Sequence, residues 1–224
     1  MKRNFPLAGE AAGIPLMTNG LLPSDVPRGR ETALVPLVER AASGDAAAFE
    51  ELMVYSQHKV MAVSWRLLGN REDARDATQE TFLRVYKYLG RYRREEDFFG
   101  WLYRITVNVC RDMERRRGIR RDRLTSLESE EEAGRLEHPA GTDDALEQTL
   151  LAQRRAMVAE AMRALPAKER AAIVLRDFEG LSTEEVAQVM GTRPATVRVQ
   201  ISSARTKIKQ YCGRLLKRKE GERR

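Results

Sequence analysis

The apolar residues between positions 197 and 215 recur at intervals of three and four, and this spacing most constrains the fold. The segment VRVQI at 197–201 alternates apolar with polar residues, which by itself favours a half-buried strand. That alternation stops at Ser202, whereas the helical spacing continues for about five turns. Length therefore favours one long amphipathic helix. Its predicted buried stripe consists of Val197, Ile201, Ala204, Ile208, Tyr211 and Leu215.

Stripes with the same period occur in three earlier segments and predict an all-α fold. Gly69 and Asn70 end the first segment, and Gly90 ends the second. A further helical pattern runs from about 145 to 165, and Pro166 opens another helix. The predicted inward positions are Phe49, Leu52, Met53, Ser56, Val60, Val63 and Leu67, then Thr78, Phe82, Val85 and Leu89, then Leu102, Ile105, Val109 and Met113.

Composition divides the 224 residues into two small helical domains joined by a flexible linker. The N-terminal extension is rich in Gly, Pro, Ala and Asn, and the linker combines acidic residues with Gly and Pro. The predicted boundaries are 1–30 for the flexible extension, 31–117 for the first domain, 118–144 for the acidic linker, 145–212 for the second domain and 213–224 for a basic tail.

Positive charge is concentrated at the C-terminal end of the chain. The net charge is +7, yet residues 193–224 alone hold 11 Lys or Arg and 2 Asp or Glu. The remainder is therefore close to neutral. A basic end on a near-neutral body favours a polyanionic partner. A solvated basic tail without a partner is the alternative that charge alone leaves open.

The polar residue inventory offers no catalytic, metal or cofactor site. Cys110 and Cys212 are far apart, and His58 and His138 stand alone. No phosphate-binding glycine loop occurs. No segment reaches the length of a membrane span, and the N-terminus is a poor signal peptide. We therefore expect a cytoplasmic protein with no direct membrane insertion, no cofactor and no enzymatic activity.

Residues 181–209 have the pattern of a helix-turn-helix. Ser182 and Glu185 are spaced as a capping box at the start of a short helix. Gly191 fits the tight turn, Thr192 is placed to cap the second helix, and Pro194 is tolerated in its first turn. The second helix of such a pair usually enters the major groove of DNA.

The residues outside the apolar stripe of this second helix are the candidate duplex-DNA contacts. Arg198 can read guanine, Ser202 and Ser203 can donate or accept hydrogen bonds, and Val199 can only contact methyl groups or exclude water. The later cations would hold phosphates, which adds affinity without sequence information. A merely solvated basic face is the alternative. The candidate set is Thr196, Arg198, Val199, Ser202, Ser203, Arg205, Lys207 and Lys209.

Three longer segments stand out: DARDATQETFLRVYKYL and FFGWLYRITVNVCRDMERRR in the first predicted domain, and ALPAKERAAIVLRDFEGLSTEEVAQVMGTRPATVRVQISSARTKI in the second. The first two resemble region 2 of bacterial sigma factors, and the third resembles region 4. Regions 2 and 4 joined by a short linker resemble the extracytoplasmic-function (ECF) group. The resemblance covers about residues 45–117 and 145–210. It implies a stress-response factor that binds core RNA polymerase, recognises minus-10 and minus-35 promoter elements and promotes DNA melting.

The resemblance also assigns surfaces within the first domain. Asp73, Asp76, Gln79 and Glu80 match the helix that docks on a coiled coil of the polymerase's largest subunit. The following loop and helix match the minus-10 reader, which captures the melted non-template strand with aromatic, amide and cationic groups. Phe98 is equally compatible with the hydrophobic core. The matching residues are Tyr92, Arg93, Arg94, Phe98, Asn108, Arg111 and Arg115.

The family implies further partners that the residues do not identify. An anti-sigma factor, often anchored in the membrane, sequesters many family members, so the chain is expected at the nucleoid or held at the membrane by that partner. The acidic linker would thread the polymerase cleft, where it either mimics nucleic acid or serves as a solvated spacer. The resemblance assigns no role to residues 1–30, and neither the inducing signal nor the anti-sigma factor can be identified.

Departures from the family pattern leave the promoter sequence and its regulon open. Ala195 replaces a common glycine, Val199 lies where polar residues are usual, and Ser202 and Ser203 replace a pair that is often aromatic or basic. Two other functions account for part of this pattern. A stand-alone dimeric DNA-binding regulator would leave the first-domain motifs unexplained. An enzyme acting on nucleic acid would need clustered carboxylates or metal ligands that the sequence does not offer.

Overall fold

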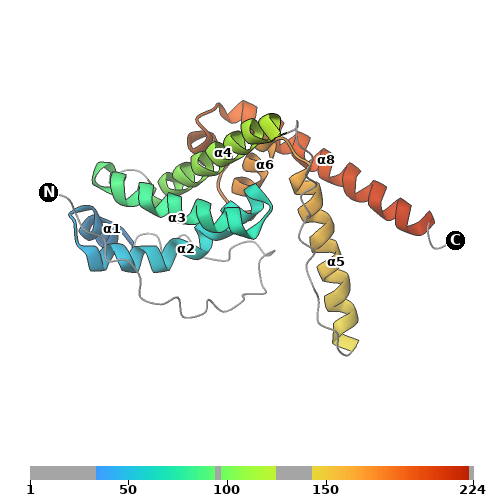
Figure 1. The fold of residues 1–224 in the computed structure, drawn as a ribbon, viewed down its shortest axis with the longest axis horizontal. Helices are drawn as coiled ribbons and strands as arrows, with labels where there is room; N and C mark the ends of the chain where they lie inside the picture. The colour runs from blue at the N-terminus through green and yellow to red at the C-terminus, as the bar shows by residue number, and fades with distance from the viewer. Residues whose placement is uncertain (1–33, 94–96, 125–142, 222–224) are drawn as a thin grey trace.

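The computed structural model describes residues 34–93, 97–124 and 143–221, and every regular element in these ranges is helical (Figure 1). This confirms the predicted all-α fold. The N-terminal group is α1 (Val35–Ala42), α2 (Ala46–Leu68), α3 (Arg71–Tyr88), η3 (Leu89–Arg91) and α4 (Phe98–Leu124); the C-terminal group is α5 (Asp143–Arg163), α6 (Ala167–Ile173), η4 (Val174–Phe178), α7 (Thr183–Met190) and α8 (Pro194–Gly221).

Two of the predicted segments lie wholly or mainly outside the described residues. These are the N-terminal extension at 1–30 and the acidic linker at 118–144. Helix α4 continues to Leu124, past the predicted end of the first domain at residue 117. The predicted domain boundaries therefore stay predictions.

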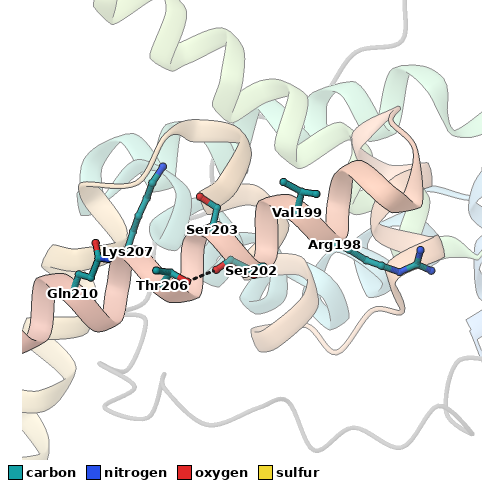
Figure 2. A pocket seen from close by; sticks show the side chains of 7 residues that line it. All are labelled: Arg198, Val199, Ser202, Ser203, Thr206, Lys207 and Gln210. Atoms are coloured by element: carbon teal, nitrogen blue, oxygen red, sulfur yellow. Dashed lines mark hydrogen bonds between the residues drawn. The ribbon is translucent and has the colours of Figure 1, made fainter.

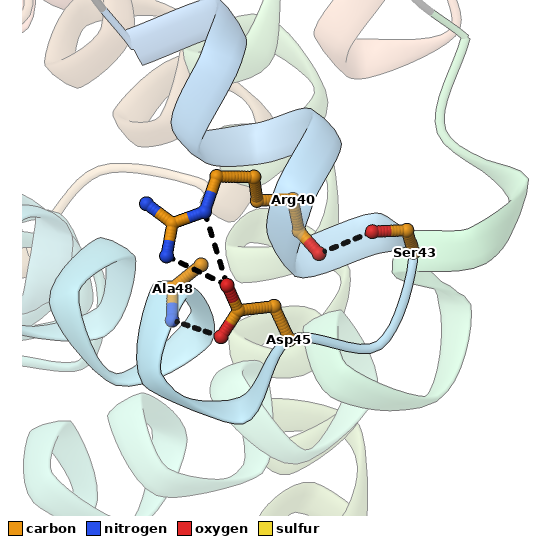
Figure 3. Close-up of polar contacts among 4 residues, drawn as sticks. All are labelled: Arg40, Ser43, Asp45 and Ala48. Atoms are coloured by element: carbon orange, nitrogen blue, oxygen red, sulfur yellow. Dashed lines mark hydrogen bonds and ion pairs between the residues drawn. The ribbon is translucent and has the colours of Figure 1, made fainter.

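Asp45 fixes the corner between α1 and α2. Its carboxylate accepts the backbone N–H of Ala48 at 3.1 Å and two N–H groups of Arg40 at 3.0 and 2.6 Å, while the Ser43 hydroxyl donates to the Arg40 carbonyl (Figure 3). The hydrogen bond from Ala48 and the adjacent guanidinium lower the pKa of Asp45. A carboxylate at this N-cap position satisfies backbone donors that the first turn of a helix leaves unpaired.

The predicted apolar stripes form the core of the first group. Phe49, Leu52, Val60, Val63 and Leu67 are buried on α2, and Met53 is partly buried. On α3 and η3 the stripe Phe82, Val85 and Leu89 is buried, and on α4 Leu102 and Val109 are buried. Helix periodicity was a reliable guide because each stripe packs against neighbouring helices.

Gly69 ends α2 as predicted and also admits a helix from the other group. Its φ of 77° is left-handed, which favours glycine. A Cβ at this position would lie 2.7 Å from Cδ of Arg163 on α5. Asn70 then caps α3 by accepting the backbone N–H of Asp73 at 2.8 Å. The α2–α3 turn is thus set by local sequence and by a distant helix together.

The helix-turn-helix is formed by α7 and α8. Both hydrogen bonds of the predicted capping box between Ser182 and Glu185 are present. Gly191 is left-handed, with a φ of 62°. The predicted cap at Thr192 is wrong, because α8 begins at Pro194 and Arg193 directly precedes it. The backbone N–H of Thr192 instead closes the end of α7 by donating to the Ala187 carbonyl at 2.9 Å.

The two groups pack against each other around one continuous apolar core. Helix α7 contacts α4, and both α5 and η4 contact α2. The lower part of α5 and the C-terminal half of α8 extend away from this body in different directions (Figure 1). The two predicted sigma-like halves are therefore compactly associated in this conformation.

Candidate nucleic-acid interface

The apolar stripe of α8 determines which side of the helix faces outward. Val197 and Ala204 are fully buried, Ile201 is nearly so, and Ile208 is partly buried against the same core. The stripe predicted from spacing is therefore confirmed for these four residues. Because a helix turns about 100° per residue, Val199, Ser202 and Thr206 lie on the side of α8 opposite this stripe.

A shallow groove of about 640 Å³ lies along that opposite side of α8. Figure 2 shows its lining side chains along one side of the helix, with Val199 between Arg198 and Ser203. The predicted duplex-DNA contacts supply five of the seven lining residues. These residues are Arg198, Val199, Ser202, Ser203, Thr206, Lys207 and Gln210.

Thr206 and Gln210 line this groove but were not among the predicted contacts. Thr206 follows Ser202 at the helical spacing of four, and Gln210 follows Thr206 at the same spacing, so the periodicity that located the buried stripe could have located them. The Thr206 hydroxyl donates to the Ser202 carbonyl at 3.0 Å (Figure 2). Thr196 and Lys209, which were predicted, are exposed but do not line the groove.

Acidic side chains of the neighbouring helices contact the cations of α8. Lys207 Nζ lies 2.7 and 2.9 Å from the carboxylate oxygens of Glu169 on α6, and the Ser203 hydroxyl donates to the same carboxylate at 3.1 Å. Arg205 donates two hydrogen bonds to Asp177 of η4, at 3.0 and 2.6 Å, and this pairing raises its pKa. These cations are thus oriented by internal carboxylates before any ligand binds.

Arg198 has the most exposed of these ion pairs. Its Nη2 lies 3.2 Å from Glu184 on α7, and the side chains are 64% and 62% exposed. An ion pair this exposed contributes about 0–1 kcal/mol. Arg198 can therefore exchange Glu184 for another partner at little cost.

A cluster of aromatic rings lies where the minus-10 reader was predicted. The ring of Tyr92 is 6.1 Å from that of Phe98 and 5.5 Å from that of Trp101, both in edge arrangements. Phe98 is only 6% exposed and packs against Tyr92 and Trp101, so in this conformation it offers no face to a base. Tyr92 and Trp101 are half-buried. Of the two roles that the sequence left open for Phe98, hydrophobic core or DNA contact, the structure favours the hydrophobic core.

The polar residues of this predicted reader lie on the surface. Asn108, Arg111 and Arg115 are exposed at spacings of three and four along α4, which places them on one side of the helix. Arg93 is exposed in the preceding loop, and Arg94 lies outside the described residues. The structure therefore brings together three of the predicted groups as one polar and cationic row.

The predicted polymerase-docking residues on α3 divide into two sets. Asp76 and Gln79 are exposed, and the half-buried Glu80 accepts a hydrogen bond from Arg84 at 2.8 Å. Asp73 is only 13% exposed and pairs with Arg117 of α4, so it ties two helices of the bundle together.

Leu83 was not predicted as a docking residue, yet it is 51% exposed. Its spacing of four from Gln79 and seven from Asp76 places it on the same face of α3. An exposed apolar side chain thus lies among the residues predicted to dock on the polymerase.

Two titratable groups of the described interior, Cys110 and Glu114, have pKa values that burial raises. Burial raises the pKa of the Cys110 thiol to about 12, so this thiol stays protonated at neutral pH. Burial also raises the pKa of Glu114, although its ion pair with Arg170 acts in the opposite direction. Within the described residues no group of three His, Cys, Asp or Glu could hold a metal ion, and no helix is long and apolar enough to cross a membrane.

Comparisons with known proteins match both halves of the chain. Residues 52–120 match the family model for sigma-70 region 2, and residues 155–208 match the model for sigma-70 region 4. The ECF RNA polymerase sigma factor SigE of Mycolicibacterium smegmatis is 38% identical over 192 residues, covering 84% of this chain and 69% of that protein. The RNA polymerase sigma-H factor of Pseudomonas aeruginosa is 34% identical over 182 residues, and the alignment covers 81% of this chain and 94% of that protein.

Two solved structures have the same fold. One is the sigma factor RpoE in complex with the anti-sigma factor NepR from Bartonella quintana, with a TM-score of 0.58 and 20% identity over 73% of this chain and 95% of that one. The other is CnrH in complex with the cytosolic domain of CnrY, with a TM-score of 0.55 and 26% identity over 80% of this chain and 96% of that one.

Proposed function

Because this chain belongs to the sigma-70 family of RNA polymerase sigma factors, in the ECF group, we propose that α8 and the α3–α4 surface divide promoter and polymerase binding between them. As a sigma factor, the protein binds core RNA polymerase, recognises promoter DNA and initiates transcription. It is an initiation factor and not an enzyme. The proposals below concern which residues carry out each step.

The exposed side of α8 is proposed to bind the minus-35 element as duplex DNA. The observation that carries this proposal is the groove opposite the buried stripe, where Arg198, Ser202 and Ser203 accompany Lys207. An α-helix with such side chains fits the major groove. Arg205 and Lys209 lie outside the groove lining and would contact phosphates.

The exposed row on α4 is proposed to bind the minus-10 element after melting. Asn108 has an amide that can pair with a base edge, while Arg111 and Arg115 suit the backbone of a single strand. Arg93 and Tyr92 at the preceding loop extend this surface. The buried Phe98 would act by holding Tyr92 and the loop in place.

The exposed face of α3 is proposed to dock on core polymerase. Asp76, Gln79 and Glu80 supply polar groups, and Leu83 supplies an apolar contact in their midst. Asp73 would contribute indirectly, because its pairing with Arg117 orients α3 against α4. Polar groups around an apolar anchor are the usual composition of a protein interface.

An anti-sigma factor is proposed as a further partner, and the cytoplasm as the site of action. The structure of RpoE with the anti-sigma factor NepR, a complex of a protein with the same fold, supports the first proposal. The proposal of a cytoplasmic site of action is supported by the partners of a sigma factor, core polymerase and promoter DNA. Cell fractionation with and without a membrane-anchored partner would test whether that partner holds the chain at the membrane.

Run-off transcription with purified core polymerase and genomic promoter fragments tests the proposed function. We expect a defined transcript only when both the chain and core polymerase are present. Equal initiation without the chain, or no initiation from any fragment, would contradict the proposal. Specific binding of palindromic duplex DNA by the chain alone, without polymerase-dependent initiation, would instead favour a stand-alone regulator.

A further inference from the structure

Val199 is the most exposed large apolar side chain in the described part of the protein, at 68%. It projects on the side of α8 opposite Val197, Ile201 and Ala204, whose side chains are 0%, 7% and 0% exposed. Packing within the protein therefore does not account for a valine at this position. What sets Val199 apart from an isolated surface valine is its place in the groove that also holds Arg198, Ser202, Ser203 and Lys207.

The chemistry around Val199 indicates what that partner is. Arg198 precedes it, and Ser202, Ser203 and Lys207 follow along the same groove (Figure 2). The exposed Leu83 on α3 is accompanied by the carboxylates of Asp76 and Glu80, which would repel phosphates. Around Val199 the surroundings are cations and hydroxyls, which match phosphates and base edges. Nucleic acid is the partner that this charge pattern favours.

The major groove of DNA offers one apolar group to such a side chain, the C5 methyl of thymine. Valine suits this contact because its branched Cβ allows essentially one χ1 rotamer in a helix, so its two methyl groups are held in fixed positions. Little side-chain entropy is then lost on binding. A polar residue here would form a hydrogen bond to a base edge, whereas valine can only recognise a methyl group.

We propose that Val199 reads the C5 methyl of a thymine in the upstream promoter element and thereby selects thymine over cytosine at that position. The inference rests on the proposed binding of duplex DNA by α8 and specifies part of what that helix recognises. Arg198 and the two serines would fix neighbouring positions by hydrogen bonding, so Val199 would add an apolar position to an otherwise polar recognition surface.

The test uses holoenzyme reconstituted from core polymerase and the full chain. Duplexes that it binds are first selected from a pool with a randomised upstream element. Each thymine of the selected element is then replaced in turn by deoxyuridine, which removes the methyl group and leaves the hydrogen-bonding groups unchanged. Affinities are measured for the wild type, for Val199→Ala and for Val54→Ala. Val54 is the matched control, since it is a 59% exposed valine on α2.

We expect a selected thymine whose replacement by deoxyuridine weakens wild-type binding about fourfold, the effect of burying one methyl group. In Val199→Ala the same replacement should weaken binding less than about twofold, while Val54→Ala should behave as the wild type. Selection with Val199→Ala should relax the preference for thymine at that position alone.

Three results would overturn the inference while leaving the proposed function intact. The wild-type holoenzyme could initiate at the selected sequence with no thymine enriched in the upstream element. The deoxyuridine effect could be equal in wild type and Val199→Ala at every thymine. Val199→Ala could lower transcription without changing the methyl effect, which would point to a protein contact. Failure of the wild type to select or initiate at any promoter would overturn both proposals.

Discussion

Arg198 and Lys209 differ in surroundings although both are exposed cations on α8. Arg198 lies in the groove beside Val199 and has a weak, exchangeable partner in Glu184. Lys209 lies outside the groove lining. A guanidinium can form two parallel hydrogen bonds to guanine, whereas an ammonium on a flexible stem acts as a point charge. The two residues should therefore contribute differently to promoter recognition.

Arg198→Ala should reduce affinity for the preferred upstream element by about 1–3 kcal/mol and relax its sequence preference. Lys209→Ala should weaken binding to all sequences alike and reduce the slope of log affinity against log salt by about 1. Fluorescence anisotropy of holoenzyme on preferred and scrambled duplexes, at several salt concentrations, measures both effects. A uniform loss from Arg198→Ala would exclude a base-reading role for that residue.

At the scale of the element, a carboxylate of α6 pairs with one of the cations on the exposed side of α8. The Glu169 carboxylate is 16% exposed and holds both Lys207 and Ser203, so one acidic side chain occupies a cation and a hydroxyl of the groove. A phosphate that binds Lys207 competes with this carboxylate for the same ammonium group. We therefore expect this contact to weaken non-specific attraction to DNA while the positive charge of Lys207 is retained.

Glu169→Gln should release Lys207 and strengthen binding to any duplex, because an extra cation becomes available for phosphate. We expect the salt slope to steepen by up to about 0.9, the value for one additional phosphate contact on B-DNA. Glu50→Gln, an exposed change of the same charge on α2, is the control for net charge. Equal slopes for the two variants would show that Glu169 does not restrain Lys207.

At the scale of the whole molecule, a buried polar cluster joins the two groups of helices. The Glu179 carboxylate, 4% exposed, lies 3.0 Å from Arg66 Nη1 of α2 and accepts the hydroxyl of Tyr103 of α4 at 2.7 Å. Arg66 also lies over the ring of Phe178, 4.9 Å from its centre. Burial lowers the pKa of Arg66, and Glu179 opposes that effect. This cluster joins α2, α4 and the residue that follows η4. The compact association of the two groups therefore depends on contacts among three segments that are distant in sequence.

Glu179→Gln should destabilise this association, because it removes the carboxylate that pairs with the buried Arg66 guanidinium. Removing one partner of a buried pair costs about 3–5 kcal/mol, whereas Glu184→Gln in the exposed pair should cost no more than about 1 kcal/mol. Denaturant unfolding gives the stability, and small-angle X-ray scattering gives the radius of gyration. Unchanged stability and radius in Glu179→Gln would show that the cluster does not hold the groups together.

What the sequence determined by itself was local. The spacing of Val197, Ile201 and Ala204 predicted the helix and its buried side, since periodicity is a property of one element. Ser182 and Glu185 predicted a capping box, which needs residues only three positions apart. The family followed from motifs of the same kind. The predicted cap at Thr192 was wrong because the turn uses the backbone N–H of that residue to end α7.

What only the tertiary structure decided was the partner of each polar group and the depth of each ring. Asp73 pairs with Arg117 instead of facing outward, Phe98 is buried, and Glu179 joins helices from both groups. The five-residue π-helical segment η4 places Glu179 at its end and was not predicted. These features depend on contacts between residues far apart in the chain, and the energy of burying a charge or ring is fixed only when all its neighbours are in place.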